Sequence, residues 1–97
     1  MTRVVYTPRA RRELNRIVET IAADNPRAAD AFVARLERQC SLLATTPGMG
    51  RARPEVGPAV RSLVRENYLI FYRWNSEQDR VDILCVRHGR RRLPRLS

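Results

Sequence analysis

Apolar residues in the first half of the chain recur with the spacing of an amphipathic helix. Over residues 8–23 and again over residues 26–45, an apolar side chain stands at every third or fourth position. Each stretch begins with a capping residue followed by proline, Thr7-Pro8 and Asn25-Pro26, which is typical of a helix N-terminus. Pro47-Gly48 ends the second stretch. The pattern predicts two helices, joined by so short a connection that they form an antiparallel hairpin.

A period of two replaces the helical spacing in the second half of the chain. Half of residues 47–58 are glycine or proline, which predicts a loop. Beyond it, alternation predicts strands at residues 60–64, 68–74 and 80–87, and a short β-branched stretch predicts another strand at residues 3–6. Residues 68–74 are apolar on both faces, so we expect this strand in the middle of the sheet.

In the last predicted strand, Val81, Ile83 and Cys85 alternate with residues of the opposite face, so all three are expected on one side. Together these elements predict one α+β domain over residues 1–97, with a basic tail from about residue 88. The expected fold is an N-terminal strand, an antiparallel helical hairpin and a three-stranded C-terminal meander, forming a curved antiparallel sheet.

Arginine dominates the charge of this 97-residue chain. All 19 basic residues are arginine, and 10 acidic residues leave a formal net charge of +9. Such an excess favours an anionic partner, which is nucleic acid, an anionic membrane or an acidic protein. The absence of lysine excludes lysine-based chemistry such as a Schiff base. An arginine-rich genome would produce the same bias, so the residue type alone assigns no role.

Cysteine and histidine are scarce. Cys40 and Cys85 are the only cysteines, and His88 is the only histidine. A structural zinc site needs four such ligands, so we expect no metal and no other cofactor. Both cysteines fall in apolar stretches, which favours buried reduced thiols and leaves a disulfide open. No apolar run reaches membrane-spanning length, and the first residues do not resemble a secretion signal, so we expect a cytoplasmic protein without a membrane partner.

The densest charged feature is the segment from Arg87 to Arg95, which holds five arginines and no acid. A solvated basic tail is one interpretation. Arg61, Arg73 and Arg87 nevertheless each fall on a predicted strand, where long cations suit a wet sheet face that meets an anionic surface. Guanidinium groups bind phosphates and carboxylates alike through paired hydrogen bonds. We interpret the arginines along the meander and its end as a cationic recognition surface.

His88 is the one group suited to acid–base chemistry near neutral pH. Cleavage of a phosphodiester would also need a second proton-transfer group and a cation for the developing negative charge. Glu55, Tyr68 and Tyr72 are candidates for the second group, but no spacing forces any of them beside His88. A histidine at a strand end is equally typical of a structural or solvent-facing role. The tyrosines and Trp74 fit the core as well as a platform for stacking bases.

Five segments carry a resemblance to a known family. They are Tyr6-Thr7-Pro8 with Ala10 and Leu14, residues 47–51 with 53–55, Arg61-Ser62, residues 68–73, and residues 86–91. In this order they are similar to ParE-type toxins of the RelE/ParE superfamily, the toxic halves of bacterial type II toxin–antitoxin modules. The resemblance covers essentially the whole chain. It implies a helical hairpin against a twisted antiparallel sheet, an antitoxin that wraps the domain, and toxicity once the antitoxin is degraded.

Two activities occur within the superfamily that the chain resembles. RelE-like members cut messenger RNA in the ribosomal A site, whereas ParE-like members poison DNA gyrase without being nucleases. The chain lacks the lysines of many RelE-like sites, and Gly89 follows His88 where another ribonuclease pattern has tyrosine. The ending matches the His-Gly-Arg-Arg of ParE-like chains, although Arg92 stands where those chains often have an acid. The resemblance therefore favours gyrase as the target and no enzymatic activity.

The partners expected on this interpretation are DNA gyrase and an acidic antitoxin. The residues expected to contact the target or partner are Arg61, Arg73, Arg87, His88, Arg90 and Arg91. The alternative is a ribosome-dependent endoribonuclease, in which His88 is the general acid or base and Arg61 and Arg73 stabilise the transition state. A third hypothesis is a basic module that binds only nucleic acid, with an affinity that falls steeply with salt.

Overall fold

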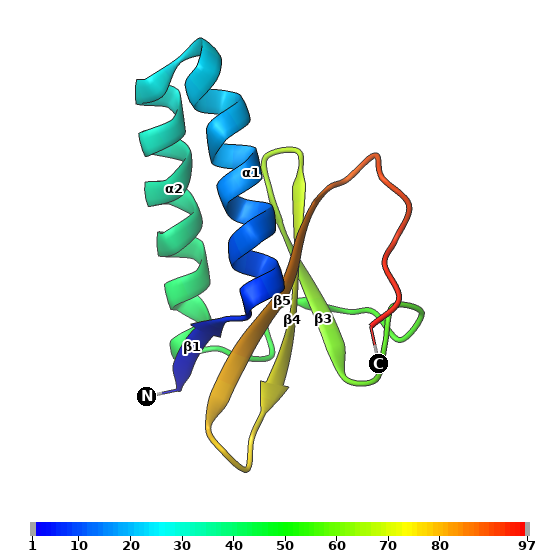
Figure 1. Cartoon of the computed structure of the whole chain (residues 1–97). Helices are drawn as coiled ribbons and strands as arrows, with labels where there is room; N and C mark the ends of the chain where they lie inside the picture. The colour runs from blue at the N-terminus through cyan, green and yellow to red at the C-terminus, as the bar shows by residue number, and fades with distance from the viewer. Residues whose placement is uncertain (1, 97) are drawn as a thin grey trace.

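A computed structural model describes residues 2–96, which fold as two helices beside a five-stranded sheet (Figure 1). The strand β1 (Arg3–Tyr6) is followed by the helices α1 (Pro8–Asp24) and α2 (Pro26–Ser41), and a 3₁₀ turn, η1 (Leu42–Ala44), continues α2. The remaining strands are β2 (Arg51–Ala52), β3 (Val60–Arg65), β4 (Tyr68–Asn75) and β5 (Arg80–His88). Each predicted helix and strand is present, and the two-residue β2 is an addition to the prediction.

Both helices start at the predicted caps. The Thr7 hydroxyl accepts a hydrogen bond from Ala10 N at 3.2 Å and donates to Ile83 O at 2.9 Å, so one side chain caps α1 and ties it to β5. The side-chain oxygen of Asn25 accepts from Ala28 N at 3.1 Å, and the N–H of Asn25 donates to the last turn of α1. One residue thus ends α1 and caps α2, which explains the tight hairpin.

The strands are ordered β1-β5-β4-β3-β2, which puts β4 in the middle, as predicted. The pairs from β2 to β5 are antiparallel, whereas β1 runs parallel to β5, from Arg3 opposite Arg80 to Tyr6 opposite Ile83. The whole sheet is therefore mixed, and only the meander and β2 are antiparallel. Side-chain alternation does not encode the direction of a neighbouring strand, and the long connection from β1 to β5 permits a parallel pair.

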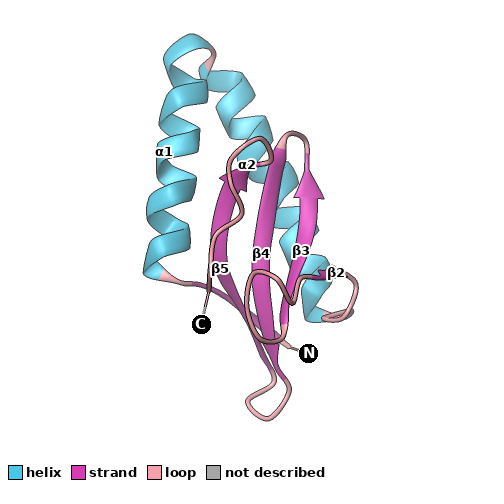
Figure 2. Ribbon diagram, turned by 90° about the vertical axis from the view of Figure 1, so that its right-hand side faces the viewer, coloured by secondary structure: helices cyan, strands magenta, loops and turns pink. Residues whose placement is uncertain are grey.

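Apolar side chains fill both sides of the sheet. The helices cover one side, called the helix side, where Phe32 and Leu36 of α2 belong to the same cluster as Ile70, Tyr72 and Ile83. The loop after β2 and the C-terminal segment cross the other side, called the loop side (Figure 2). A smaller buried cluster lies there and consists of Val56, Val60, Phe71 and Cys85. The fold thus has the two predicted layers and a partial third layer of irregular chain.

A β-bulge in β5 moves Cys85 to the loop side. Phe71 pairs with Cys85 while the next residue, Tyr72, pairs with Ile83, so Leu84 is an extra residue in β5. Ile83 belongs to the helix-side cluster, but Cys85 packs with Phe71 on the loop side. The expectation that Cys85 shares a side with Ile83 is therefore wrong, because alternation is interrupted by one inserted residue.

The C-terminal segment is folded against the sheet. Leu96 N donates to Val56 O at 2.6 Å, and the Leu96 side chain packs against the loop-side cluster. Gly57 permits this approach, because a Cβ at that position would lie 1.9 Å from Leu96 O. Pro94 is also buried. The last described residues therefore do not form a solvated tail. Residues 90–92, by contrast, are exposed.

The two cysteines are free thiols and both are buried, as predicted. Cys40 belongs to the helix-side cluster and Cys85 to the loop-side cluster, so the sheet separates them. Neither helix within residues 2–96 is both long and apolar enough to cross a lipid bilayer.

Candidate functional site

Cationic side chains gather where β5 ends and the chain turns back. We name residues 87–92 the β5 end, and this segment contains four of the predicted contact residues, Arg87, His88, Arg90 and Arg91. Three of its arginines are exposed, and within residues 2–96 their guanidinium groups have no hydrogen-bond or ion-pair partner: Arg90, Arg91 and Arg92. The turn therefore presents three cations to the solvent.

Hydrogen bonds and a ring contact hold His88 in this turn. Its ring lies edge-on to that of Tyr68, with centroids 5.4 Å apart and an interplanar angle of 80°. Nδ1 of His88 accepts a hydrogen bond from Arg90 N at 3.1 Å, which leaves the proton of the neutral ring on Nε2. Gly89 N donates to Asn67 O at 2.7 Å and joins the turn to the β3–β4 connection. His88 is thus part of the scaffold that orders the β5 end.

A hollow of about 210 Å³ lies between α1 and the β5 end. Its lining includes Arg16 from α1, Tyr68 from β4, and His88 and Arg91 from the β5 end. Arg16 is exposed, and its guanidinium group has no partner within residues 2–96. A fourth cation therefore stands across the hollow from the β5 end, which makes this part of the surface suited to an anionic group.

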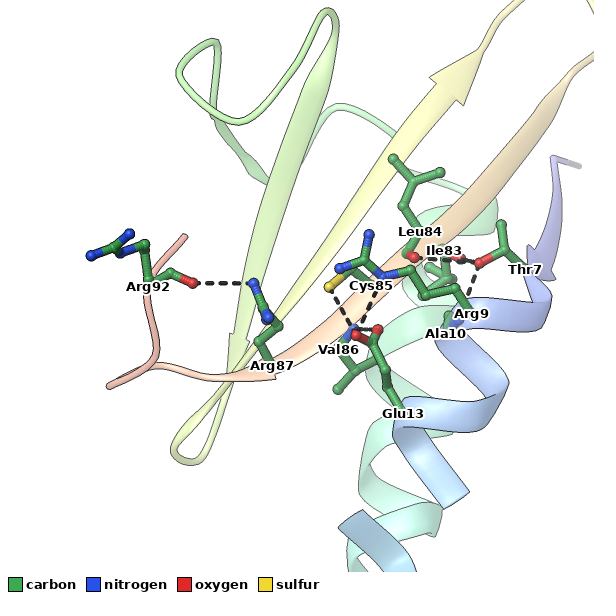
Figure 3. Close-up of polar contacts among 10 residues, drawn as sticks. All are labelled: Thr7, Arg9, Ala10, Glu13, Ile83, Leu84, Cys85, Val86, Arg87 and Arg92. Atoms are coloured by element: carbon green, nitrogen blue, oxygen red, sulfur yellow. Dashed lines mark hydrogen bonds and ion pairs between the residues drawn. The ribbon is translucent and has the colours of Figure 1, made fainter. Parts of the chain in front are cut away.

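Glu13 is the acid that lines the same hollow, and its carboxylate is already bound by neighbouring residues of the fold (Figure 3). Its carboxylate accepts hydrogen bonds from Val86 N at 3.1 Å and from the Cys85 thiol at 3.6 Å, and it forms an ion pair with Arg9 at 3.4 Å. Burial, followed by the charge of Glu13, raises the pKa of Cys85 from 9.0 to about 12. Glu13 therefore joins α1 to β5. No cluster of three metal-binding side chains occurs in the described part of the chain.

Arg61 and Arg73 lie away from the β5 end, and both bind main-chain carbonyl groups. Arg61 Nη1 donates to Gly50 O at 2.8 Å, and Arg73 Nε donates to Pro58 O at 2.9 Å. Arg61 follows the alternation of helix-side residues in β3, and Arg73 follows that of loop-side residues in β4. The two side chains therefore leave the sheet on opposite sides.

The register of β4 gives the separation between Arg61 and the β5 end. Tyr72 is opposite Arg61, and Tyr68 is opposite His88. Four residues of strand separate these two positions, or about 13 Å at roughly 3.3 Å per residue. The structure thus brings together four of the six predicted contact residues and leaves Arg61 and Arg73 elsewhere.

The sequence matches one family along most of its length. Residues 4–93 match the family described as the ParE toxin of the type II toxin–antitoxin system, parDE. The chain is also 35% identical over 96 residues to Y4kP of Sinorhizobium fredii, a protein named as a candidate toxin. That match covers 97% of this chain and 95% of Y4kP. This chain belongs to the ParE toxin family.

Solved toxin structures share the fold of this ParE-family chain. A chromosomal ParDE system from P. aeruginosa aligns with a TM-score of 0.74 at 23% identity, covering 91% of this chain and 96% of that chain. The E. coli RelBE complex aligns at 0.67 and 16% identity, covering 94% and 100%. The RelBE2 complex from Mycobacterium tuberculosis aligns at 0.63 and 28% identity, covering 90% of each chain. The chain is a type II toxin of the ParE/RelE superfamily, as its motifs predict.

In this ParE-family chain, Tyr72 anchors the loop between α2 and β3, a role that no pattern in the sequence indicates. The Tyr72 hydroxyl donates to Pro47 O at 2.7 Å and accepts from Gly50 N at 2.8 Å. A Cβ at position 50 would lie 2.6 Å from the Tyr72 oxygen, so only glycine fits without displacement. Burial raises the pKa of Tyr72. Both residues belong to the motifs of the family resemblance, but a motif does not show which of its members meet.

Proposed function

We propose that this ParE-family toxin binds DNA gyrase, traps it on cleaved DNA and so stops DNA replication. It cleaves no nucleic acid itself, it acts in the cytoplasm, and an acidic antitoxin neutralises it. The observation that carries the proposal is the separation of His88 from Arg61 and Arg73. The ribonuclease alternative needs all three at one phosphate group.

Cleavage of RNA requires its acid, base and cation within hydrogen-bond reach of a single phosphodiester. His88 and Arg61 are attached to the two strands that flank β4, about 13 Å apart along the strand direction alone, and Arg73 leaves the sheet on the other side. Each arginine also donates to a carbonyl oxygen that would lose its partner if the side chain turned away. This arrangement supports a binding protein and disfavours a nuclease built from these three residues.

The β5 end has the properties of a recognition surface. Its three exposed arginines are free of partners within residues 2–96, so binding costs no internal ion pair. Guanidinium groups form paired hydrogen bonds with carboxylates and phosphates, both of which a gyrase–DNA complex presents. The hydrogen-bonded turn around His88 reduces the conformational entropy lost on binding.

The antitoxin is expected to be acidic because the chain carries a net charge of +9. Two of the solved structures with this fold, from E. coli and Mycobacterium tuberculosis, are toxin–antitoxin complexes. A short acidic reading frame beside the gene would supply such a partner. Its product is expected to restore growth when it is produced together with this chain.

The proposal is tested with purified protein, purified gyrase and a plasmid. In the presence of gyrase and micromolar wild-type chain, linear or nicked plasmid is expected to accumulate. Denaturation and proteolysis of the trapped complexes reveal these DNA forms. The double variant Arg90→Gln and Arg91→Gln should reduce trapping at least tenfold. Arg27→Gln removes one exposed arginine at the start of α2 and serves as the control, with trapping unchanged.

Two outcomes would contradict the proposal. One is unaltered gyrase activity at micromolar wild-type protein. The other is cleavage of messenger RNA in a translating extract that disappears in His88→Ala, which would establish the ribonuclease alternative. Inducing the chain alone in cells separates the same hypotheses, because gyrase poisoning activates the DNA damage response before translation stops.

A further inference from the structure

The hollow between α1 and the β5 end presents hydrogen-bond donors from three elements of the fold. The guanidinium groups of Arg16 and Arg91 line it, have no partner within residues 2–96 and can only donate. The hydroxyl group of Tyr68 also forms no hydrogen bond within these residues. In His88 the ring proton lies on Nε2, because Nδ1 accepts from Arg90 N. Four lining side chains therefore have a free N–H or O–H group.

The acceptors of the same hollow are largely in use. Both oxygens of the Glu13 carboxylate are bound, since Oε1 accepts from Val86 N at 3.1 Å and Oε2 is in the ion pair with Arg9 at 3.4 Å. Thr20 adds a hydroxyl group, which donates to the main-chain oxygen of Arg16 at 2.9 Å. The hydrogen-bonding capacity that remains in the hollow is thus mainly that of a donor.

The size and charge of the hollow limit its occupant. Its volume of about 210 Å³ is below the roughly 300–1,000 Å³ of pockets that hold drug-sized ligands, so it suits one compact group. Three arginines and one glutamate of its described lining leave a formal charge of +2. The hollow is therefore matched to a small anionic group, such as a phosphate or a carboxylate.

Further cations stand beside the hollow without lining it. Arg90 and Arg92 belong to the same turn as Arg91, are exposed, and have guanidinium groups without a partner within the described residues. An isolated anion in the hollow would leave both of them unpaired. A polyanion would bind them as well, and each strand of DNA carries one negative charge per about 3.4 Å of helix axis.

Hydrogen-bond chemistry distinguishes between two kinds of polyanion. An acidic polypeptide brings a main-chain N–H donor with nearly every residue, and a donor that faces the donors of this hollow would stay unpaired. The backbone of DNA presents phosphate and sugar oxygens, which only accept, and it lacks the 2′-hydroxyl donor of RNA. A hollow rich in free donors therefore favours the DNA backbone over a polypeptide.

We infer that the hollow between α1 and the β5 end binds a phosphate group of DNA, while Arg90 and Arg92 bind neighbouring phosphates. Contacts of this kind position a protein on the duplex without reading its sequence. The inference rests on the proposed function only in placing this DNA within the gyrase complex. There the toxin holds the DNA duplex directly and so joins the enzyme to its substrate.

Fluorescence anisotropy of a short labelled duplex, titrated with the full-length protein and without gyrase, tests the inference. The expected Kd is about 10⁻⁶–10⁻⁴ M at physiological salt, the range of binding through phosphates. Two duplexes of unrelated sequence should bind with affinities within twofold of each other. The logarithm of affinity should fall with the logarithm of salt concentration with a slope of about −2.7 or steeper, for three or more phosphates at about 0.9 each.

Three variants locate the contact. Arg16→Gln should weaken the duplex at least tenfold and reduce the magnitude of the salt slope by about 1. Arg38→Gln is the matched control, because Arg38 is an exposed, unpartnered arginine of α2 outside this hollow, and affinity should change less than twofold. Tyr68→Phe removes a neutral donor, so affinity should fall about threefold with an unchanged salt slope.

A competing ligand examines the chemistry of the occupant. A glutamate peptide with as many charges as one strand of the duplex should displace the labelled DNA at least tenfold less effectively than unlabelled duplex does. Equal displacement by the peptide would assign the hollow to an acidic polypeptide. Equal losses in Arg16→Gln and Arg38→Gln would mean that net charge alone attracts DNA. Either result, or affinity that depends strongly on sequence, would overturn the inference.

The gyrase assay keeps this result separate from the proposed function. Arg16→Gln should need at least threefold more protein than the wild-type chain for equal trapping, and unchanged trapping would overturn a role of the hollow in holding DNA. Failure of the wild-type chain to trap gyrase would defeat the proposed function and leave the anisotropy result standing. Trapping by a wild-type chain that binds no free duplex would support the proposed function and overturn this inference.

Discussion

The arginines of the strands and those of the β5 end carry the same charge and have different partners. Arg61 and Arg73 each donate to a main-chain carbonyl oxygen, at 2.8 and 2.9 Å. Arg90, Arg91 and Arg92 are exposed, with no partner for their guanidinium groups in the described chain. The first pair stabilises the loop between α2 and β3, and the second group is available to a target.

This difference shows why net charge does not locate a binding surface. All 19 arginines contribute equally to the value of +9. A guanidinium that donates to a carbonyl oxygen is held in place by that hydrogen bond and must lose it to turn toward an anion elsewhere, whereas an unpartnered one loses only water. The free surface therefore lies where arginines lack partners, and the count of arginines per strand gives no guide to it.

Replacing Arg61 with leucine is expected to have the largest effect on stability. The change removes a charged donor from Gly50 O, and such hydrogen bonds contribute about 1.5–3 kcal/mol. The thermal midpoint should fall by roughly 6 to 24 °C, at about 4–8 °C per kcal/mol. Circular dichroism during heating measures the shift. A change below about 0.5 kcal/mol would place Arg61 with the exposed group.

Tyr72→Phe is expected to have the next largest effect on stability. It should lower the free energy of unfolding by about 1–2 kcal/mol, because the Tyr72 hydroxyl makes two hydrogen bonds to the same loop. Tyr72 and Arg61 both bind Gly50, so the double variant should deviate from additivity by at least about 0.5 kcal/mol. Urea unfolding of the wild-type chain, the two single variants and the double variant measures the coupling free energy between Tyr72 and Arg61. Strict additivity would mean that the loop has two independent anchors.

Stability should decline in alkaline solution while the arginines stay charged. The pKa of Cys85 is about 12 in the folded chain and 9.0 ordinarily, so the unfolded chain loses the thiol proton first. The contribution of the Cys85 thiol to the free energy of unfolding is complete below pH 9. It is lost as the pH rises toward 12, by about 1.4 kcal/mol per pH unit. Unfolding at pH 8, 9.5 and 10.5 measures the decline. Cys85→Ala should have a shallower slope, and an unchanged slope would assign the decline to other groups.

The triple variant Arg90→Gln, Arg91→Gln and Arg92→Gln should have the smallest effect on stability. Exposed substitutions without partners change the free energy of unfolding by about 0.5 kcal/mol or less. Removing three neighbouring like charges also relieves repulsion, so the thermal midpoint should stay constant or rise slightly. Differential scanning calorimetry measures it. A marked fall would show that the β5 end belongs to the structural group of arginines.

Local chemistry in the sequence was sufficient to predict most elements of the fold. Thr7 and Asn25 cap the helices at the predicted positions because capping depends on a few neighbouring residues. The central place of β4 followed from apolar residues on both of its faces. The bulge at Leu84 was not predictable, because residues 83–86 are all apolar and their sequence does not show where the alternation of faces is interrupted.

The candidate site was only partly predictable for a related reason. The cluster at the β5 end is contiguous in sequence, so Arg87, His88, Arg90 and Arg91 necessarily lie near one another. The partners of Arg61 and Arg73 are backbone oxygens in a loop of irregular conformation, and no periodic pattern encodes such contacts. The hollow between α1 and the β5 end was not predictable either, because its lining combines residues from α1, β4 and the β5 end that are far apart in the chain.

The parallel pair of β1 and β5 has a consequence for biosynthesis. Thr2 and Asp79, which directly precede these two strands, are hydrogen-bonded to each other and lie 77 positions apart in the chain. At about 5–20 residues per second, a ribosome therefore adds Asp79 roughly 4 to 15 seconds after Thr2, and β1 has no partner strand until then. Premature termination ahead of residue 80 yields fragments that lack the strand joining β1 to β4. The sheet that carries the β5 end therefore cannot be complete in a nascent chain until β5 itself has been synthesised.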